Sequence, residues 1–451
     1  MIKHIQSSFP ILVVILLLMT SCSKNASVFI DSQGNEFATK KVYETVKGLK
    51  DSSLNYAMVF PENYTGKELL PVLFLLDPHA DGSFPVKKYS ELANKYNYIL
   101  VGSNVSRNGL SSALLQKHVR GLLGEITSRF KVDNKRLFVG GFSGGAKLAI
   151  MFAVQMPEFI GAIACGGSLP SANSGEPQYY YVGIVGDKDF NYLEMRQSFG
   201  IYDQYGFDYT AVVFDGKHEW PPVETFEMGL IGFEIYSNKI KRKELSKEWL
   251  EELKQELITR AKNMADEGKI IDQYEILQQT KRWFYGLSSV TEIQKEINVL
   301  SQSRVFGQQL QQRQLLVKQE LKLRMEFIKA IESRDFVWWQ TELGKISKGN
   351  QNSTEKTLVK QRLLNYISMA SFMLVKNDLN DEKLDNALDK IKIYELVDPL
   401  NPDVYLMYAK YYLLMNNHGQ MKLAYAKAKD LGFNTKNYRN DTFWKDLMEV
   451  N

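Results

Sequence analysis

A serine at position 143 lies in a pattern that suits nucleophilic chemistry. Ser143 is the central residue of a G-x-S-x-G element, residues 141–145, which follows a short apolar run and precedes a helix-like stretch, residues 146–154. A sharp turn from a strand into a helix strains the serine backbone and needs glycine on either side, because larger side chains collide there. The sequence therefore predicts a serine hydroxyl above a sheet, beside helix N–H groups that can receive an oxyanion.

Two groups that can activate such a serine follow later in the chain. An apolar run ends at Gly186 and leads to Asp187 and Asp189, which are candidate acids at the carboxyl end of a strand. A second apolar run, residues 210–214, leads to His218, a candidate base. A carboxylate can hold an imidazole in the required tautomer, and the imidazole can take the serine proton. Each group ends a separate predicted strand, so one parallel sheet can bring them together.

These residues resemble the catalytic groups of α/β-hydrolases, especially the small esterases related to feruloyl esterases and polyhydroxybutyrate depolymerases. The serine element looks like their nucleophile elbow, and the order Ser, Asp, His is theirs. In related esterases the acid usually follows the glycine by three residues, which favours Asp189 and leaves Asp187 as a turn residue or helix cap. His218 before Trp220 resembles their G-x-H-x-W ending. The resemblance implies a triad of Ser143, Asp189 and His218 that cleaves an ester without cofactor or metal, although a peptidase has the same motif.

The oxyanion hole that the resemblance implies has an unusual loop. Its donors would be the N–H of Gly144 and an N–H of the loop after an early strand, residues 77–82. The loop begins with aspartate where a histidine is common, and Pro78 has no N–H to donate. We therefore expect His79 or Ala80 to supply the second donor.

The same loop permits a different interpretation. Asp77, His79 and Asp81 are residue types that bind metals, so the chain can also be a metal-dependent hydrolase. Alternate residues of one loop rarely converge on an ion without a fourth ligand from elsewhere. The main prediction therefore remains a site with no metal and no cofactor.

The surroundings of the site suggest an open cleft. Only about a dozen residues, 166–178, separate the strand after the serine from the strand before the acid, so a helical lid has no room there. Trp220, Phe190 and Tyr192 are expected either to wall this cleft or to be core residues, and an open cleft with aromatic walls suits an ester of a bulky or polymeric acid.

The elements that must position these groups alternate between strands and helices. Many of the strands are apolar on both faces, as in a parallel sheet covered on both sides. This pattern suits an α/β-hydrolase and equally a flavodoxin-like fold, but the motifs favour an α/β-hydrolase domain over residues 40–238. The expected strands are 56–60, 71–76, 98–101, 137–140, 160–165, 179–185 and 210–214, and the expected helices are 86–96, 110–130, 146–155 and 192–205.

The composition changes after the α/β region, where apolar residues recur at helical spacing to the end of the chain. Two stretches look like tetratricopeptide units, because Ile391 and Tyr394 recur as Tyr425 and Ala428 about 34 residues later. We expect an all-α, tetratricopeptide-like domain over 239–451 that binds a protein or peptide partner or covers the active site. A generic helical bundle is the alternative.

The first residues have the pattern of an export signal. Lys3 precedes an apolar run, residues 9–19, which is short for a membrane span, and small residues lead to Cys22. Cys22 stands where a bacterial lipobox places its lipidated cysteine. We expect a lipoprotein signal peptide at 1–21 and a tether at 22–39, so that the chain is anchored to a membrane in the periplasm or at the outer-membrane surface. An ordinary signal peptide with a chance cysteine is the alternative.

Composition excludes several classes of protein. A chain of 451 residues with 44% apolar and 12% aromatic residues is globular and too long for one ordinary domain. A net charge of +4 is small for this length and gives no reason to expect a nucleic-acid partner. Cys165 is the only other cysteine, so we expect it to be a buried core residue without a disulfide. The alternative to an enzyme is a non-catalytic hydrolase-fold lipoprotein that binds partners through its helices.

Overall fold

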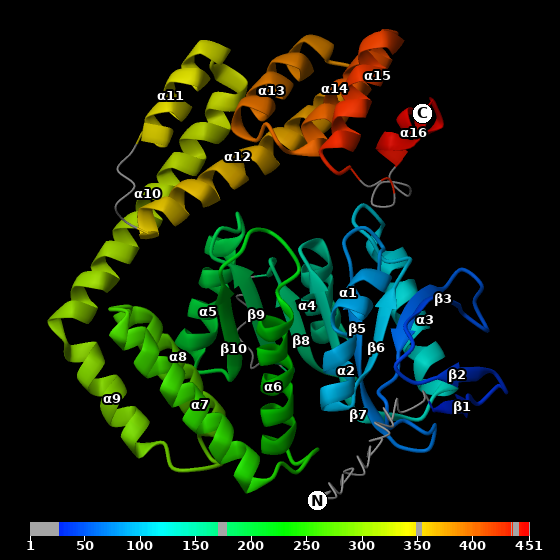
Figure 1. The fold of residues 1–451 in the computed structure, drawn as a ribbon, viewed down its shortest axis with the longest axis vertical. Coiled ribbons are helices and arrows are strands. Elements are labelled where there is room, and N and C mark those ends of the chain that lie inside the picture. The colour runs from blue at the N-terminus through cyan, green and yellow to red at the C-terminus, as the bar shows by residue number, and fades with distance from the viewer. Residues whose placement is uncertain (1–26, 170–177, 349–353, 434, 436–441, 451) are drawn as a thin grey trace, which may run out of the picture.

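The computed structural model has an α/β half followed by an all-helical half (Figure 1), which confirms the predicted fold class. It describes residues 27–169, 178–348, 354–433, 435 and 442–450. The predicted signal peptide and Cys22 lie outside these residues, as does part of the connection predicted to lack a lid, residues 170–177. Among the helices of the described residues, none combines the length and apolar character that crossing a membrane requires.

The α/β half is built on an eight-stranded sheet with the strand order β10-β9-β8-β7-β5-β6-β4-β3. Within this sheet the pairs β3–β4 and β4–β6 are antiparallel, because β4 runs opposite to the other strands, and the remaining pairs are parallel. Eight strands in this order, with the second strand antiparallel and helices on both faces, form an α/β-hydrolase fold and not a flavodoxin-like one. The strands are β3 (Tyr43–Lys47), β4 (Asn55–Val59), β5 (Leu70–Leu76), β6 (Ile99–Ser103), β7 (Val132–Phe142), β8 (Phe159–Cys165), β9 (Tyr180–Gly186) and β10 (Tyr209–Phe214).

Two hydrophobic clusters, one on each face of the sheet, hold the helices in place. Alternate residues of β5 enter different clusters, with Phe74 in one and Leu73 and Leu75 in the other, because successive strand side chains point to opposite faces. One cluster contains side chains of α3 (Ser112–Arg129), α4 (Gly144–Gln155) and α5 (Tyr192–Tyr205). The other contains side chains of α1 (Ser83–Lys88), α2 (Ser90–Tyr96) and α6 (Val223–Lys239). The helix expected at 86–96 is thus two short helices that meet at Tyr89.

The N-terminal segment corrects one prediction. β1 (Val28–Ile30) and β2 (Glu36–Ala38) form an antiparallel hairpin inside the range 22–39 that the sequence assigned to a tether. Phe29 and Phe37 are buried in the same cluster as α3, because two aromatic side chains gain more from burial than a solvated tether allows. The tether prediction is therefore wrong for the hairpin. Three-residue strands are too short to give a period in the sequence.

The helical half consists of long helices that pack in pairs. α12 packs on α13, and α14 packs on α15. The positions that suggested tetratricopeptide units, among them Ile391 and Tyr425, are buried together in one cluster, while the repeat type itself stays a prediction. The helices are α7 (Lys247–Asp266), α8 (Ile270–Phe284), α9 (Thr291–Gln302), α10 (Arg304–Ser333), α11 (Phe336–Lys348), α12 (Thr354–Asn380), α13 (Leu384–Val397), α14 (Pro402–Leu414), α15 (His418–Asp430) and α16 (Lys445–Val450).

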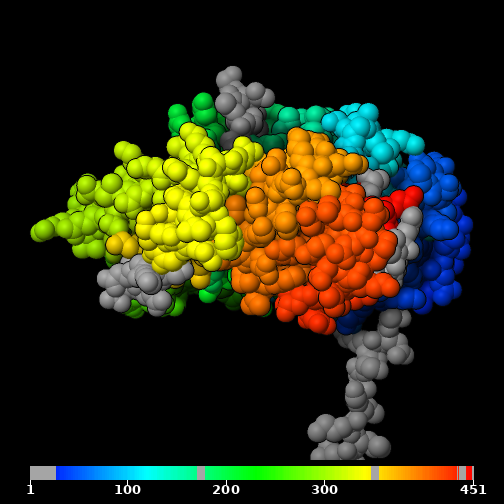
Figure 2. Space-filling view, turned by 90° about the horizontal axis from the view of Figure 1, so that it is seen from above, coloured from blue at the N-terminus to red at the C-terminus, as the bar shows by residue number. Residues whose placement is uncertain are grey.

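The helical half folds back over the α/β half instead of extending away from it. After α6, α7 and α8 pack against the outer side of the α/β half through a cluster that joins Ile235 of α6 to Leu257 and Trp283. α10 then leads upward, and α11 to α15 spread across the top of the molecule (Figures 1 and 2). Side chains of α10 and α12 contact the residues that follow β9, so the helical half reaches the carboxyl edge of the sheet.

Candidate active site

Ser143 lies in the turn between β7 and α4 with a backbone that few residues adopt. Its φ of 54° and ψ of −117° place it outside the regions that suit most side chains, so the surrounding structure must hold it there. Two glycines permit this close turn. A Cβ on Gly141 would overlap the backbone of Gly145, and a Cβ on Gly145 would overlap the carbonyl of Leu76. The G-x-S-x-G element therefore has the conformation of a nucleophile elbow.

The structure brings Ser143, His218 and Asp189 into one hydrogen-bonded chain. The Oγ of Ser143 is 2.9 Å from Nε2 of His218, and Nδ1 of His218 is 2.9 Å from both carboxylate oxygens of Asp189. Asp189 is only 1% exposed, and its carboxylate also accepts the N–H of Asn191 at 2.7 Å. A buried carboxylate at Nδ1 directs the free electron pair of a neutral imidazole to Nε2, which faces the serine hydroxyl.

Asp187, the other candidate acid, has a different contact. Its carboxylate accepts the N–H of Gly216 at 3.2 Å and so braces the turn before His218. Partial burial raises its pKa above the usual value, although that hydrogen bond and nearby Lys188 act in the opposite direction. Of the two candidate acids, only Asp189 contacts the imidazole of His218.

The imidazole is enclosed by Phe190, one of the aromatic residues expected near the site, and by Phe142 and Gly166, which the sequence did not indicate. The ring of His218 lies against Phe142 and Phe190, with centroid distances of 4.6 and 4.1 Å. Gly166, at a φ of 59°, lies close to both groups, since a Cβ there would come within 2.9 Å of the Asp189 carboxylate and 3.3 Å of the His218 ring. Cys165 is buried as predicted, and its carbonyl accepts the N–H of Ser143 at 2.8 Å. Burial raises the pKa of its thiol well above the usual value.

The oxyanion side differs from the prediction. The N–H of His79 donates to the carboxylate of Asp77 at 2.8 Å, and the N–H of Ala80 donates to the Asp77 carbonyl at 3.2 Å. Both expected donors therefore bond within their own loop, because an aspartate at the start of a turn takes up the following N–H groups. The N–H of Gly144 lies in the first turn of α4, where helix N–H groups have no intrahelical acceptor.

Trp220 is a core residue, which was the alternative to a wall of the cleft. It is 6% exposed, so it does not wall an open cleft, and its Nε1–H donates to Asp77 at 2.9 Å. A buried indole needs a partner for its N–H, and the carboxylate that replaces the common histidine supplies one. Burial raises the pKa of Asp77, although the bonds from Trp220 and His79 act to lower it. This pair ties the loop of the base to the loop at the oxyanion side.

Asn108 is a polar group at the oxyanion side that the sequence did not indicate. Its carboxamide lies directly over Gly144, where any Cβ would overlap it. The backbone holds it there, since the N–H of Asn108 donates to the Pro78 carbonyl at 3.0 Å and Arg107 pairs with His79. Asparagine in a loop after a strand is an ordinary turn residue, so no sequence signal distinguished it.

The metal interpretation of the 77–82 loop has no geometric basis. Within the described ranges, no group of three or more His, Cys, Asp and Glu side chains is arranged to hold a metal ion. Asp77 instead accepts hydrogen bonds from Trp220 and His79, while Asp81 accepts one from Ser83 at 2.7 Å.

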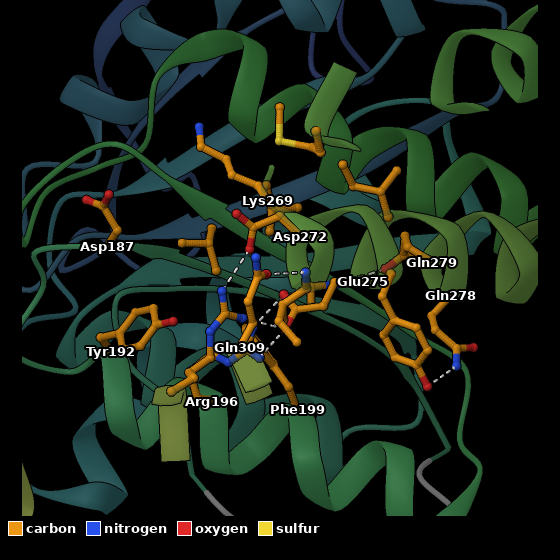
Figure 3. A pocket seen from close by; sticks show the side chains of 18 of the residues that line it. Asp187, Tyr192, Arg196, Phe199, Lys269, Asp272, Glu275, Gln278, Gln279 and Gln309 are labelled. Carbon is orange, nitrogen blue, oxygen red and sulfur yellow. Dashed lines mark hydrogen bonds and ion pairs between the residues drawn. The ribbon is translucent and has the colours of Figure 1, made fainter. Parts of the chain in front are cut away.

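A large cavity lies beside the site, between α5 and β10 of the α/β half and α8, α10 and α12 of the helical half (Figure 3). Its volume is about 1220 Å³. Several charged side chains that line it pair with one another: Glu275 accepts from Arg196 at 2.5 Å and from Arg313 at 3.1 Å, and Arg313 also reaches Asp272 at 2.9 Å. The triad side chains are not part of its lining, so this cavity is separate from the candidate active site.

Comparison with known proteins gives a likeness of fold. The sequence matches no protein-family model, and it matches no curated protein. Similar solved structures include an S-formylglutathione hydrolase (FrmB) from Staphylococcus aureus, which is 13% identical with a TM-score of 0.36 over 43% of this chain and 97% of that one. A ferulic acid esterase is 17% identical with a TM-score of 0.35 over 42% and 95%. Porphyromonas gingivalis dipeptidyl peptidase 4 is 15% identical with a TM-score of 0.30 over 45% and 34%.

Proposed function

We propose that the protein is a serine hydrolase that cleaves carboxylic esters through an acyl-enzyme. One observation carries this proposal: Ser143 stands in a strained turn with its Oγ 2.9 Å from Nε2 of His218, whose other nitrogen is 2.9 Å from buried Asp189. Groups in this geometry convert a hydroxyl into a nucleophile. A scaffold that only bound partners would have no need to hold a serine at a φ of 54°.

In the proposed mechanism, Oγ of Ser143 attacks the ester carbonyl carbon while His218 accepts the hydroxyl proton. The N–H of Gly144 stabilises the oxyanion, and the Asn108 carboxamide above it is the second candidate donor. When the tetrahedral intermediate collapses, the bond to the alcohol oxygen breaks and His218 returns the proton to that oxygen. Water, activated by His218, then releases the acid and restores Ser143. Asp189 orients the imidazole and stabilises its cation in both steps.

The ester substrate, the location and the partner belong to the proposal as well. The elbow, the acid spacing and the histidine motif favour esters through their resemblance to esterases. The apolar run before Cys22 supports export and a lipid anchor, which would hold the enzyme on a membrane surface facing the periplasm or the exterior. Paired helices such as α14 and α15 provide a surface for a protein or peptide partner.

Labelling with a fluorophosphonate probe tests the proposed reaction. We expect the probe to modify wild type and not Ser143→Ala, with labelling unaffected by a chelator. Asp189→Asn should slow labelling on the order of 10³- to 10⁴-fold, because the imidazole loses its orienting acceptor, whereas the matched variant Asp187→Asn should label nearly as wild type does. Equal labelling of wild type and Ser143→Ala would exclude the reaction. A panel of acetyl, feruloyl and longer-chain esters would then identify the acyl group.

A further inference from the structure

The loop that carries the proposed acid is held from two sides. Its N–H groups bond toward the base: Asp187 donates to the Phe214 carbonyl at 2.8 Å, and Lys188 donates to the Gly216 carbonyl at 2.9 Å. Most of its carbonyl groups bond instead to the helical half. Three of them accept side-chain donors from α10 and α12, which are about 130 to 180 residues away in the chain. The fourth, the Asp189 carbonyl, accepts the N–H of Tyr192 at 3.0 Å.

The three donors are Arg362, Asn365 and Arg324. Arg362 donates to the Asp187 carbonyl at 2.9 Å, and Asn365 donates to the Lys188 carbonyl at 2.8 Å. Arg324 donates to the Phe190 carbonyl at 2.8 Å. Every backbone carbonyl from 187 to 190 therefore has an acceptor role, and the residues on both sides of Asp189 are fixed by the helical half.

A buried carboxylate holds the two arginines in place. Glu320 of α10 is fully buried and accepts from Arg324 at 2.6 Å and from Arg362 at 2.7 and 3.0 Å. Both guanidinium groups also lie over aromatic rings, Arg362 at 4.4 Å from Tyr192 and Arg324 at 4.5 Å from Tyr366. The paired and stacked guanidinium planes have little rotational freedom, so the N–H groups that donate to the acid loop keep a fixed direction.

We propose that Arg324, Arg362 and Asn365 are positioning residues for the triad, so that the helical half completes the active site. This inference rests on the proposed function. Arg324 and Arg362 carry two positive charges, and Glu320 neutralises one of them. The net positive charge that is left faces the carbonyl oxygens of the acid loop. The same three residues make the reaction depend on the packing of α10 against α12. A partner that shifts these helices would change the rate without touching Ser143.

Single substitutions in the full-length protein test this coupling. Arg362→Met and Arg324→Met each leave Glu320 with one arginine, so the buried charge stays balanced. We expect each to slow fluorophosphonate labelling per folded molecule on the order of 10- to 100-fold, because small displacements of catalytic groups are costly. Asn365→Leu removes one neutral hydrogen bond and should slow labelling severalfold. Arg313→Met is the matched control: it removes an α10 arginine that pairs with α8 and, at 3.6 Å, with Glu355 of α12 but has no hydrogen bond to the acid loop. It should label as wild type does, because the bonds to the loop, and not the ion pairs between helices, position Asp189.

A spectroscopic measurement separates positioning from stability. The proton on Nδ1 of His218, bonded to Asp189, should give a low-field proton resonance that is absent in Asp189→Asn. We expect this resonance to shift or broaden in the Arg362 and Arg324 variants and to stay in Arg313→Met. Variants that label at the wild-type rate with an unchanged resonance would overturn the inference while leaving the enzyme intact.

Failure of the proposed function would look different. A wild-type protein that no probe labels would exclude the serine hydrolase, but the resonance would still report whether α10 and α12 hold the His218–Asp189 pair. If Arg362→Met and Arg324→Met do not fold, Asn365→Leu decides the inference, because it alters no charge. An unchanged rate and resonance in folded Asn365→Leu would then overturn it.

Discussion

The helical half meets the α/β half in two places that differ in chemistry. At the first, α7 and α8 pack on α6 through an apolar cluster, and the indole of Trp283 is buried with its N–H bonded to Tyr180 and Thr210 at 3.1 Å. At the second, α10 and α12 present charged and amide groups, such as Arg362, to the carbonyls of the acid loop. The first contact lies where β9 and β10 begin, and the second lies where β9 ends.

This difference indicates that one contact attaches the two halves and the other positions the acid. Apolar burial is strong and tolerant of small shifts, so it suits the attachment of one half to the other. Hydrogen bonds to backbone carbonyls contribute less net stability but fix distance and direction. The Trp283 contact should therefore determine whether the halves stay together, and the Arg362 contact should determine whether Asp189 is in place.

The largest effect on stability should come from the apolar contact. Trp283→Ala would leave a cavity between α8 and α6 and should lower the free energy of unfolding by about 3–5 kcal/mol. β9 has seven residues, so Trp283 lies about 20 Å from the triad edge of the sheet, and labelling per folded molecule should not change. Chemical unfolding followed by fluorescence, together with labelling below the transition, measures both quantities.

Trp283→Phe provides the control for that substitution. It keeps most of the ring volume and loses only the N–H bonded to Tyr180 and Thr210, so it should be clearly less destabilising than alanine. If Trp283→Ala instead abolished labelling in molecules that remain folded, the apolar contact would also set catalytic geometry, and the two contacts would not have the separate roles proposed.

A buried ion cluster inside the α/β half provides the next comparison. In the helical half, Glu320 lies between two arginines, whereas here Arg129 of α3 lies between two carboxylates, Asp31 at 2.6 Å and Glu125 at 3.2 Å. Asp31 belongs to the N-terminal hairpin, so Arg129 anchors that hairpin to α3. Both clusters hold a separate segment by buried charge, but only the cluster of Glu320 touches the acid loop.

Asp31→Asn should therefore destabilise the fold and leave labelling unchanged. Burial raises the pKa of Asp31, but the hydrogen bonds from Arg129, Asn35 and Gln33 together outweigh it and hold that pKa below the usual 3.8. A lowered pKa means that the carboxylate stabilises the folded state above pH 3.8 and that this contribution is lost as pH falls further. We expect a loss of about 1–3 kcal/mol in the free energy of unfolding at neutral pH, which decreases below pH 3.8.

Urea unfolding of wild type and Asp31→Asn across this pH range measures the effect. A difference that stays constant down to the acid limit would show that Asp31 acts through shape and not through charge. If folded Asp31→Asn labelled more slowly, the loss of any buried ion pair would impair the site. Slow labelling of an Arg362 variant would then be no evidence that Arg362 positions the acid loop.

The sequence predicted the features that depend on neighbouring residues and missed those that depend on contacts between distant segments. The elbow around Ser143 could be predicted, because glycine, serine and the flanking strand and helix are neighbours in the chain and each has a local physical reason. Asp189 and His218 could be predicted because each follows a strand of a parallel sheet. The seven strands expected for the α/β half all lie within or next to observed strands, since buried strands are apolar throughout.

What the sequence did not predict depends on contacts between distant segments. Arg362 reaches Asp187 across 175 residues, and nothing in the pattern of α12 separates it from the other arginines on helical faces. The capture of the His79 N–H by Asp77, and the burial of Trp220 against the same carboxylate, follow from how two loops meet. The hairpin of β1 and β2 was missed because its two phenylalanines are buried by residues elsewhere in the chain.

The smallest expected effect concerns β10, a strand at one edge of the sheet. Gln279 of α8 imitates a neighbouring strand, since its amide oxygen accepts the Ala211 N–H at 3.1 Å and its amide nitrogen donates to the Tyr209 carbonyl at 3.3 Å. Unpaired groups on an edge strand invite pairing with another chain, and a side chain that occupies them covers the edge without adding a strand. Gln279 therefore links α8 to β10 by hydrogen bonds, beside the bonds of Trp283 to Tyr180 and Thr210 in the same contact.

Gln279→Ala should lower the free energy of unfolding by about 1 kcal/mol, because water can replace part of what is lost at a sheet edge. The Ala211 amide should exchange its hydrogen faster. Gln278→Ala is the matched control, since Gln278 bonds to Tyr274 at 2.7 Å within α8 and does not reach β10. If Gln279→Ala slowed labelling while Gln278→Ala did not, the contact at the sheet edge would be coupled to the triad through β10, and the two contacts between the halves would act as one.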